Sequence, residues 1–270
     1  QMKELKKTSV SIVIPAYNEE KRIGKTLEAY SKYFENLRIK GELNYEILIS
    51  INNTSDKTEE IVKRYAKKNK NIRYLNLIKS GKGYAIIEGF KDALKRKFNL
   101  IGFVDADMST SPPSFYDLII NLKPYDGIIG NRWASKSIIS QKQSGLRRLA
   151  SRIFNFLVKS LFLMSYQDTQ CGAKIFRREV IEKIVNKILI TQWAFDVNLL
   201  FLCKKYNFKV IEHPTTWEDK GDSKIKVVKA SLKMFFGILR LRLINSPLND
   251  LVRLYDSMPE LTKVNHRMTE

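Results

Sequence analysis

Two carboxylates separated by a single residue, Asp105 and Asp107, follow a short apolar segment that we expect to be a buried strand. Residues 100–104 read Leu-Ile-Gly-Phe-Val, and the acids come where this segment ends. In an open α/β sheet, ligands bind outside the carboxyl ends of the strands. Carboxylate oxygens at that place suit Mg²⁺ or Mn²⁺. Such an ion usually binds one or two protein carboxylates and the phosphates of a substrate at the same time. If this motif is taken alone, the alternative to a metal site is a turn in which the second acid is exposed to solvent.

Polar and ionic residues also follow three other expected strands, at 10–14, 45–51 and 72–77. These residues are Pro15, Tyr17, Glu19, Asn52, Asn53 and Lys82. If the strands are parallel, their carboxyl ends lie at one edge, where such groups can bind a base, a ribose and a metal-bound diphosphate. The sequence contains neither Gly-x-Gly-x-x-Gly nor a phosphate-loop motif, which argues against a dinucleotide or ATP-hydrolysing site.

The elements that would position these residues alternate between strand and helix patterns through the first half of the chain. We expect helices at about 19–34 and 57–68, from the turn at Gly83 to about Lys97, and from Pro112, with a short strand near 127–130. Repeated units of this kind predict an α/β fold with a mostly parallel sheet and helices on both faces.

The composition of the 270 residues fits a well-packed globular domain with an unusual charge. Apolar residues make up 44%, and 48 Lys and Arg against 28 Asp and Glu give a net charge of +20. Such a surface attracts nucleic acid, anionic lipid headgroups or phosphorylated substrates. No aromatic-and-basic RNA motif or recognition helix is present, so we expect no nucleic-acid partner. Two cysteines and two histidines make a disulfide framework and a zinc site improbable.

Two segments with many cations and no acids, 146–164 and 224–246, are predicted to form amphipathic helices. Basic amphipathic helices are typical of membrane surfaces, although such apolar stripes also pack against sheets. No stretch reaches the roughly 18 to 20 apolar residues of a membrane span, and the N-terminal residues do not resemble a signal peptide. We therefore expect a cytoplasmic protein held peripherally at the cytosolic face of a membrane. The predicted parts are a tail (1–8), a catalytic domain (9–223) that includes the first helix, the second helix, and a tail (247–270).

Several ordered motifs resemble a known family. Residues 12–19 (Ile-Val-Ile-Pro-Ala-Tyr-Asn-Glu), Gly81-Lys82-Gly83 and Asp105-Ala106-Asp107 are similar to the opening motifs of family 2 glycosyltransferases, inverting enzymes with a GT-A fold. Three later motifs resemble dolichyl-phosphate β-glucosyltransferases and the wider polyprenyl-phosphate sugar synthases. They are Asp168 to Lys174, Trp193 to Val197, and Trp217-Glu218 with Ser223-Lys224.

The resemblance implies transfer of a sugar, with glucose as the expected one, from UDP-glucose to a polyprenyl (dolichyl) monophosphate, with Mg²⁺ or Mn²⁺ as cofactor. Three alternatives stay open: a GDP-mannose-dependent polyprenyl-phosphate mannosyltransferase, another family 2 enzyme of lipid-linked glycan assembly, and an inactive relative that scaffolds a membrane complex. The lipid length and the oligomeric state are not specified by these motifs.

The resemblance also assigns roles to residues. The residues implied in nucleotide-sugar binding are Pro15, Tyr17, Glu19, Asn52, Asn53, Lys82, Asp105 and Ala106. Those implied in catalysis are Asp107, Asp196, Gln170 and Arg132, and Asp105 and Asp107 are the implied metal ligands. The residues implied in acceptor binding are Arg132, Trp217, Ser223 and Lys224.

The chain departs from the family pattern at Asn52 and Asn53, where relatives often carry two aspartates. An amide still hydrogen-bonds a uracil or a ribose but provides no anion, so the base is left open. A lipid phosphate is already an anion at neutral pH. We therefore expect Asp196 to orient the acceptor or sugar rather than to remove a proton.

Overall fold

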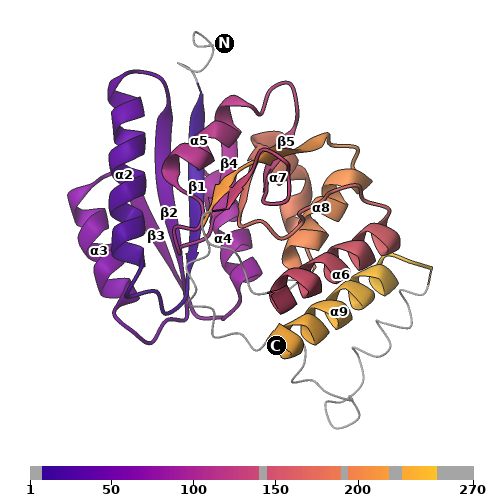
Figure 1. The fold of residues 1–270 in the computed structure, drawn as a ribbon. Helices are drawn as coiled ribbons and strands as arrows, with labels where there is room; N and C mark the ends of the chain where they lie inside the picture. Colours follow the sequence, from indigo (N-terminus) through magenta and orange to yellow (C-terminus); the bar gives the residue numbers. More distant parts are fainter. Residues whose placement is uncertain (1–7, 140–144, 190–193, 219–226, 248–270) are drawn as a thin grey trace.

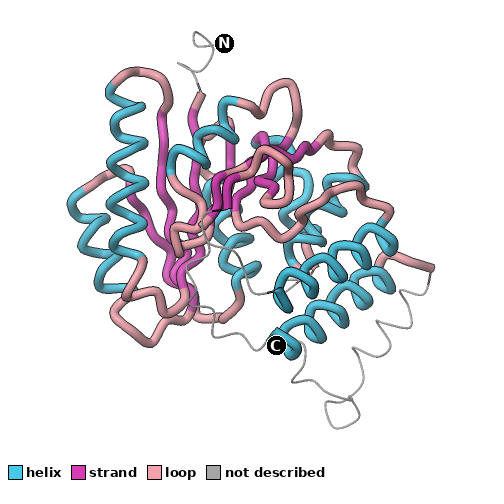
Figure 2. Tube along the Cα trace, in the orientation of Figure 1, coloured by secondary structure: helices cyan, strands magenta, loops and turns pink. Residues whose placement is uncertain are grey.

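The computed structural model describes residues 8–139, 145–189, 194–218 and 227–247. A seven-stranded sheet forms its centre (Figures 1 and 2), with the order β3-β2-β1-β4-β7-β5-β8. Its strands are β1 (Ser9–Ala16), β2 (Asn44–Asn52), β3 (Ile72–Leu77), β4 (Leu100–Val104), β5 (Gly127–Asn131), β7 (Ala173–Arg177) and β8 (Val210–Pro214). Only β7 runs antiparallel to its neighbours, so the prediction of a mostly parallel sheet is confirmed. Two short strands, β6 (Ile138–Ile139) and β9 (Thr216–Trp217), pair beside it.

Helices cover both faces of the sheet, as the alternating pattern predicts. The helices are α2 (Ile23–Ile39), α3 (Thr58–Lys68), α4 (Lys82–Leu94), α5 (Pro112–Ile120), α6 (Gly145–Phe162), α7 (Arg178–Ile184), α8 (Phe195–Lys205) and α9 (Val227–Ile244), with a 3₁₀ turn, η1 (Val185–Lys187). Side chains of α2, α3 and α5 form one apolar cluster with the sheet, and those of α4 and α6 to α9 form the other. The two clusters bury alternate residues of the same strand, such as Ile12 and Val13 of β1.

The strand order reverses at β1, which has β2 and β3 on one side and β4 on the other. Such a reversal opens a crevice at the carboxyl ends of the strands. Val13 pairs in register with Leu48 of β2 and Phe103 of β4, and the carboxyl ends of the three strands lie within about three residues of one another. The polar residues that follow these strands are therefore brought together at one edge.

One predicted helix is shifted along the sequence. The helix expected at about 19–34 begins at Ile23 and ends at Ile39. Asn18 has a positive φ of 52°, and its side-chain oxygen accepts a hydrogen bond from the Ser55 amide at 2.9 Å. These features hold the residues before α2 as a loop, which keeps Tyr17 and Glu19 at the crevice.

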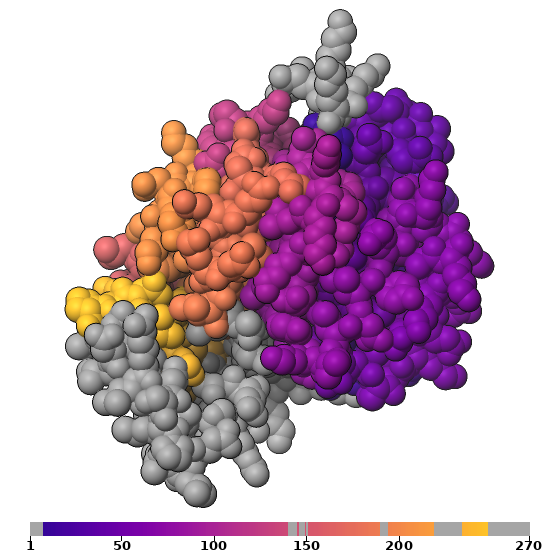
Figure 3. Space-filling model, turned by 180° about the vertical axis from the view of Figure 1, so that it is seen from behind, coloured from indigo at the N-terminus to yellow at the C-terminus, as the bar shows by residue number. Residues whose placement is uncertain are grey.

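The second half of the chain adds elements that the sequence patterns did not indicate, chiefly strands β7 and β8. The two predicted amphipathic helices are present as α6 and α9, which lie side by side (Figure 1). Seen from behind, the later elements and α9 lie on one side of the molecule and the first half of the chain on the other (Figure 3). Within the described residues, none of the helices is both long enough and apolar enough to cross a bilayer. The predicted boundary at 223/224 and nearly all of both predicted tails lie outside the described residues.

Candidate active site

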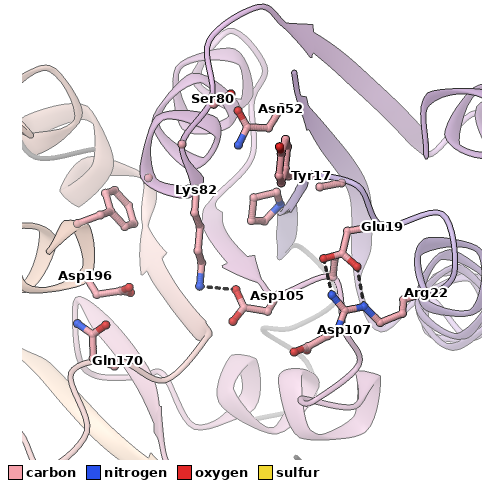
Figure 4. A pocket seen from close by; sticks show the side chains of 16 residues that line it. Tyr17, Glu19, Arg22, Asn52, Ser80, Lys82, Asp105, Asp107, Gln170 and Asp196 are labelled. Carbon is pink, nitrogen blue, oxygen red and sulfur yellow. Dashed lines mark hydrogen bonds and ion pairs between the residues drawn. The ribbon is translucent and has the colours of Figure 1, made fainter. Parts of the chain in front are cut away.

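A pocket of about 670 Å³ opens at the carboxyl ends of β1, β2 and β4, between the start of α4 and the start of α8 (Figure 4). Its lining residues are Pro15, Ala16, Tyr17, Glu19, Arg22, Asn52, Ser80, Gly81, Lys82, Gly83, Asp105, Ala106, Asp107, Gln170, Phe195 and Asp196. The pocket brings together most of the residues to which the sequence analysis gives roles. It lies at the point where the strand order reverses, as the physics of open α/β sheets predicts.

One end of the pocket carries neutral polar groups and an aromatic ring. Tyr17 is exposed, whereas Asn52 is only 3% exposed and its Oδ1 has no hydrogen-bond partner among the described residues. Asn53 does not line the pocket, and its side-chain amide donates to Ser80 Oγ at 3.0 Å. A buried acceptor without a partner costs about 1 to 3 kcal/mol, so Asn52 is poised to accept a hydrogen bond from a ligand.

The middle of the pocket is ionic. The Lys82 ammonium lies 2.5 Å from Asp105 Oδ1. Lys82 is the first residue of α4, and the preceding Gly81 has a φ of 136°, which favours glycine. Burial alone would lower the pKa of Lys82, but the carboxylates of Asp105 and Asp196 raise it above its ordinary value. Burial raises the pKa of Asp105. Lys82 opposes this rise in part, and the neighbouring carboxylates of Asp107 and Asp196 add to it. The acids therefore stabilise the charge of Lys82, and Lys82 offsets part of the cost of burying the charge of Asp105.

Asp107 lies beside this pair, and its Oδ1 accepts a hydrogen bond from the Ser109 amide at 2.9 Å. Within the described residues, no group of three or more His, Cys, Asp or Glu side chains could enclose a metal ion. Asp105 and Asp107 nevertheless fit Mg²⁺ or Mn²⁺, because such ions often take one or two protein carboxylates and complete their shell with substrate phosphates and water. The donor set thus suits a metal that binds together with a diphosphate.

Arg22 is a pocket residue that the sequence analysis missed. Its Nε and Nη2 each lie 2.7 Å from a carboxylate oxygen of Glu19. Burial raises the pKa of Glu19, and Arg22 opposes that rise. The spacing of three residues between Glu19 and Arg22 was a signal that could have identified the pair. Ser80 and Phe195 also line the pocket without having been predicted.

The other end of the pocket is formed by Gln170 and Asp196. The Gln170 Nε2 is buried and has no partner among the described residues, so it can donate to a ligand. Gly172 follows closely, and its carbonyl accepts the Asp105 amide at 3.0 Å. A Cβ at Gly172 would overlap the Asp105 carboxylate, because the backbone passes directly against that side chain. Glycine is therefore required here for a close approach.

Comparison with known proteins identifies the family. The family described as "Glycosyl transferase family 2" matches residues 11–185. The chain belongs to glycosyltransferase family 2. This glycosyltransferase is 32% identical over 239 residues to a dolichyl-phosphate beta-glucosyltransferase of Trichomonas vaginalis, an alignment that covers 86% of this chain and 70% of that protein. It is 34% identical over 244 residues to a dolichyl-phosphate beta-glucosyltransferase of Dictyostelium discoideum, with coverage of 86% and 73%.

The glycosyltransferase also resembles solved structures. One is a glucosyl-3-phosphoglycerate synthase of Mycobacterium tuberculosis in complex with Mn²⁺, UDP and glucosyl-3-phosphoglycerate. The TM-score is 0.65 at 16% sequence identity, and the match covers 90% of this chain and 84% of that chain. At this identity the likeness shows the fold alone, and it confirms the predicted GT-A fold.

Two residues predicted to bind the acceptor lie outside the pocket lining of this glycosyltransferase. Arg132 is nearly buried and binds both carboxylate oxygens of Asp168, at 2.7 and 2.8 Å. Its guanidinium lies 5.3 Å from the ring centre of Trp217, which is also buried. Their role with an acceptor stays a prediction. The other two predicted acceptor residues, Ser223 and Lys224, lie outside the described residues.

Proposed function

We propose that this glycosyltransferase transfers glucose from UDP-glucose to a polyprenyl monophosphate such as dolichyl phosphate. The observation that carries the proposal is the order of groups along the pocket (Figure 4). A buried amide at Asn52 is followed by the ionic centre of Lys82, Asp105 and Asp107, and then by Gln170 and Asp196. This order matches the base, diphosphate and sugar of a nucleotide sugar. The names of the relatives support the choice of glucose and of a dolichyl-phosphate acceptor.

In the proposed reaction, a phosphate oxygen of the acceptor attacks the anomeric carbon of the sugar as the bond to UDP breaks, which inverts that carbon. Mg²⁺ or Mn²⁺ held by Asp105 and Asp107 would neutralise the charge of the departing diphosphate. Lys82 would add a second positive charge on the same side. Gln170 would hydrogen-bond the sugar, and Asp196 would orient the sugar or acceptor. No general base is required, because the attacking phosphate is already ionised.

A donor screen tests this proposal. Nucleotide release is followed with a short polyprenyl phosphate, Mn²⁺ or Mg²⁺, and UDP-glucose, UDP-N-acetylglucosamine, UDP-galactose or GDP-mannose. We expect release that depends on the lipid and is fastest with UDP-glucose. Faster release from GDP-mannose would replace the proposal with the mannosyl alternative, and no release from any donor would contradict it.

We further propose that α6 and α9 hold the enzyme at an anionic membrane, at its cytosolic face. Each helix buries one side in the core, through Val158 of α6 and Ile238 of α9. Other apolar side chains remain exposed: Leu149, Ile153 and Phe156 on α6, and Phe236 and Leu239 on α9. Arg152 and Arg242 are exposed on the same helices. Apolar side chains flanked by cations favour a surface of anionic headgroups, where each cation contributes about 1 kcal/mol.

Replacement of Phe156 by Ser should weaken binding to anionic vesicles about tenfold, because this ring is 69% exposed and would lose its burial among the acyl chains. Co-sedimentation with vesicles of phosphatidylglycerol and phosphatidylcholine measures the effect. Ile39 of α2 is 71% exposed on the other face of the sheet, so Ile39→Ser serves as the matched control and should leave binding unchanged. Equal losses in the two variants, or binding that is insensitive to salt, would refute the membrane role of α6.

A further inference from the structure

A lysine lies in the core behind the pocket. Lys174 of β7 is 0% exposed, and its ammonium donates to Asp196 Oδ1 and to the Cys171 carbonyl, both at 2.6 Å. The same ammonium is 5.3 Å from the centre of the Phe103 ring. Asp196 itself is 6% exposed and lines the pocket. This ion pair therefore connects the interior of the protein with the end of the pocket where Gln170 lies.

A buried ion pair of this kind needs a reason beyond stability. Removing two charges from water costs several kcal/mol per ion, and well-packed apolar residues often serve equally well. Lys174 lies against the ring of Phe103, which in turn packs against Phe195 in the apolar core, so an aliphatic residue would suit this position. The pair is instead placed where one of its members faces the pocket.

Two lysines each bind one carboxylate of the pocket. Lys82 and Lys174 lie within 5.9 and 5.3 Å of the centre of the Phe103 ring, and Lys82 binds Asp105 whereas Lys174 binds Asp196. The Lys82 side chain is 44% exposed and can turn to a ligand in the pocket. Lys174 is enclosed and also bound to a backbone carbonyl, so it cannot leave Asp196.

Asp196 is thus bound by Lys174 through one carboxylate oxygen, and its second oxygen is available to a ligand. Its Oδ2 has no hydrogen-bond partner among the described residues, while Oδ1 is bound by Lys174. We propose that Lys174 is a positioning residue for sugar transfer, which fixes the orientation of the Asp196 carboxylate so that the second oxygen accepts a hydrogen bond from the sugar or acceptor. The inference rests on the proposed function, because it takes Asp196 as the group that orients a substrate.

A double-mutant cycle tests the inference. We expect Lys174→Met to lower kcat about 100-fold while the KM for the donor stays within about twofold, because a group misplaced by about 1 Å costs that much in rate. Asp196→Asn should lower kcat by a similar factor. If Lys174 acts through Asp196, the double variant should be no slower than Asp196→Asn alone.

The same variants separate positioning from stability. Lys174→Met leaves a buried carboxylate without its cation and should lower the denaturant midpoint, whereas the double variant removes both charges and should recover much of the loss. Its kcat should not recover. Arg96 is the matched control: it forms a largely buried ion pair with Glu46 and Asp92, at 2.7 and 2.6 Å, outside the pocket lining. Arg96→Met should lower stability and leave the kcat of the folded enzyme unchanged.

Two results would overturn the inference. One is a kcat for Lys174→Met that equals that of Arg96→Met. The other is a double variant whose kcat is lower than that of Asp196→Asn by the same factor by which Lys174→Met alone lowers kcat. Such additive effects would show that the two residues act independently. Failure of the proposed function is distinguishable, because it appears in the wild-type protein as the absence of nucleotide release that depends on the lipid.

Discussion

Asp107→Asn is expected to lower metal-dependent sugar transfer by about 1000-fold while the protein stays folded. Asp107 lines the pocket beside Asp105, and these are the two carboxylates that we propose as ligands of the divalent ion. An amide has the same shape but no negative charge. The amide oxygen can still accept the hydrogen bond that the Ser109 amide donates at 2.9 Å, so the loop should keep its conformation.

The measurement is nucleotide release at saturating Mn²⁺, together with the thermal unfolding midpoint. Asp117→Asn is the matched control, because Asp117 is a half-exposed carboxylate on α5 that binds His213 and does not line the pocket. It should transfer sugar at the wild-type rate. Transfer by Asp107→Asn at that rate after chelation of the metal would refute the assignment of Asp107.

Gly172→Ala is expected to lower the rate of transfer about 100-fold, although the substitution adds only one methyl group. The new Cβ would overlap Cγ and Oδ2 of Asp105. The backbone of Gly172 cannot retreat easily, because its carbonyl accepts the Asp105 amide and it directly precedes β7. The Asp105 side chain must therefore turn, and it then loses its position relative to Lys82 and the metal.

Gly145→Ala is the control for this substitution, since a Cβ at Gly145 would have no atom of the described residues within 4 Å and the residue begins a helix. Both variants should unfold cooperatively, and only Gly172→Ala should lose transfer. A binding measurement with UDP and Mn²⁺ adds a second readout, in which we expect weaker binding by Gly172→Ala alone. Wild-type binding and transfer by that variant would show that the contact with Asp105 is irrelevant to function.

The sequence was sufficient to predict the parallel half of the fold and one wall of the pocket. Strands β1, β2 and β4 have apolar runs that are followed by polar residues, β3 is followed by the glycines that flank Lys82, and parallel strands place such ends at one edge. For that reason Tyr17, Asn52, Lys82 and Asp105 could be predicted to converge although they lie far apart in the chain. The motifs of the second half supplied Gln170 and Asp196, but only through the resemblance to a family.

The tertiary structure decided how the charges in and behind the pocket are paired. The cation of Asp196 is Lys174, 22 residues earlier in the chain. The carboxylate that binds Arg132 is Asp168, 36 residues later, and the role of Arg132 with an acceptor stays a prediction. The close approach of Gly172 to Asp105 depends on β7 running antiparallel beside β4. The physical reason is that the residues of one segment determine its periodicity and its ends, whereas the order and direction of neighbouring strands determine which side chains meet.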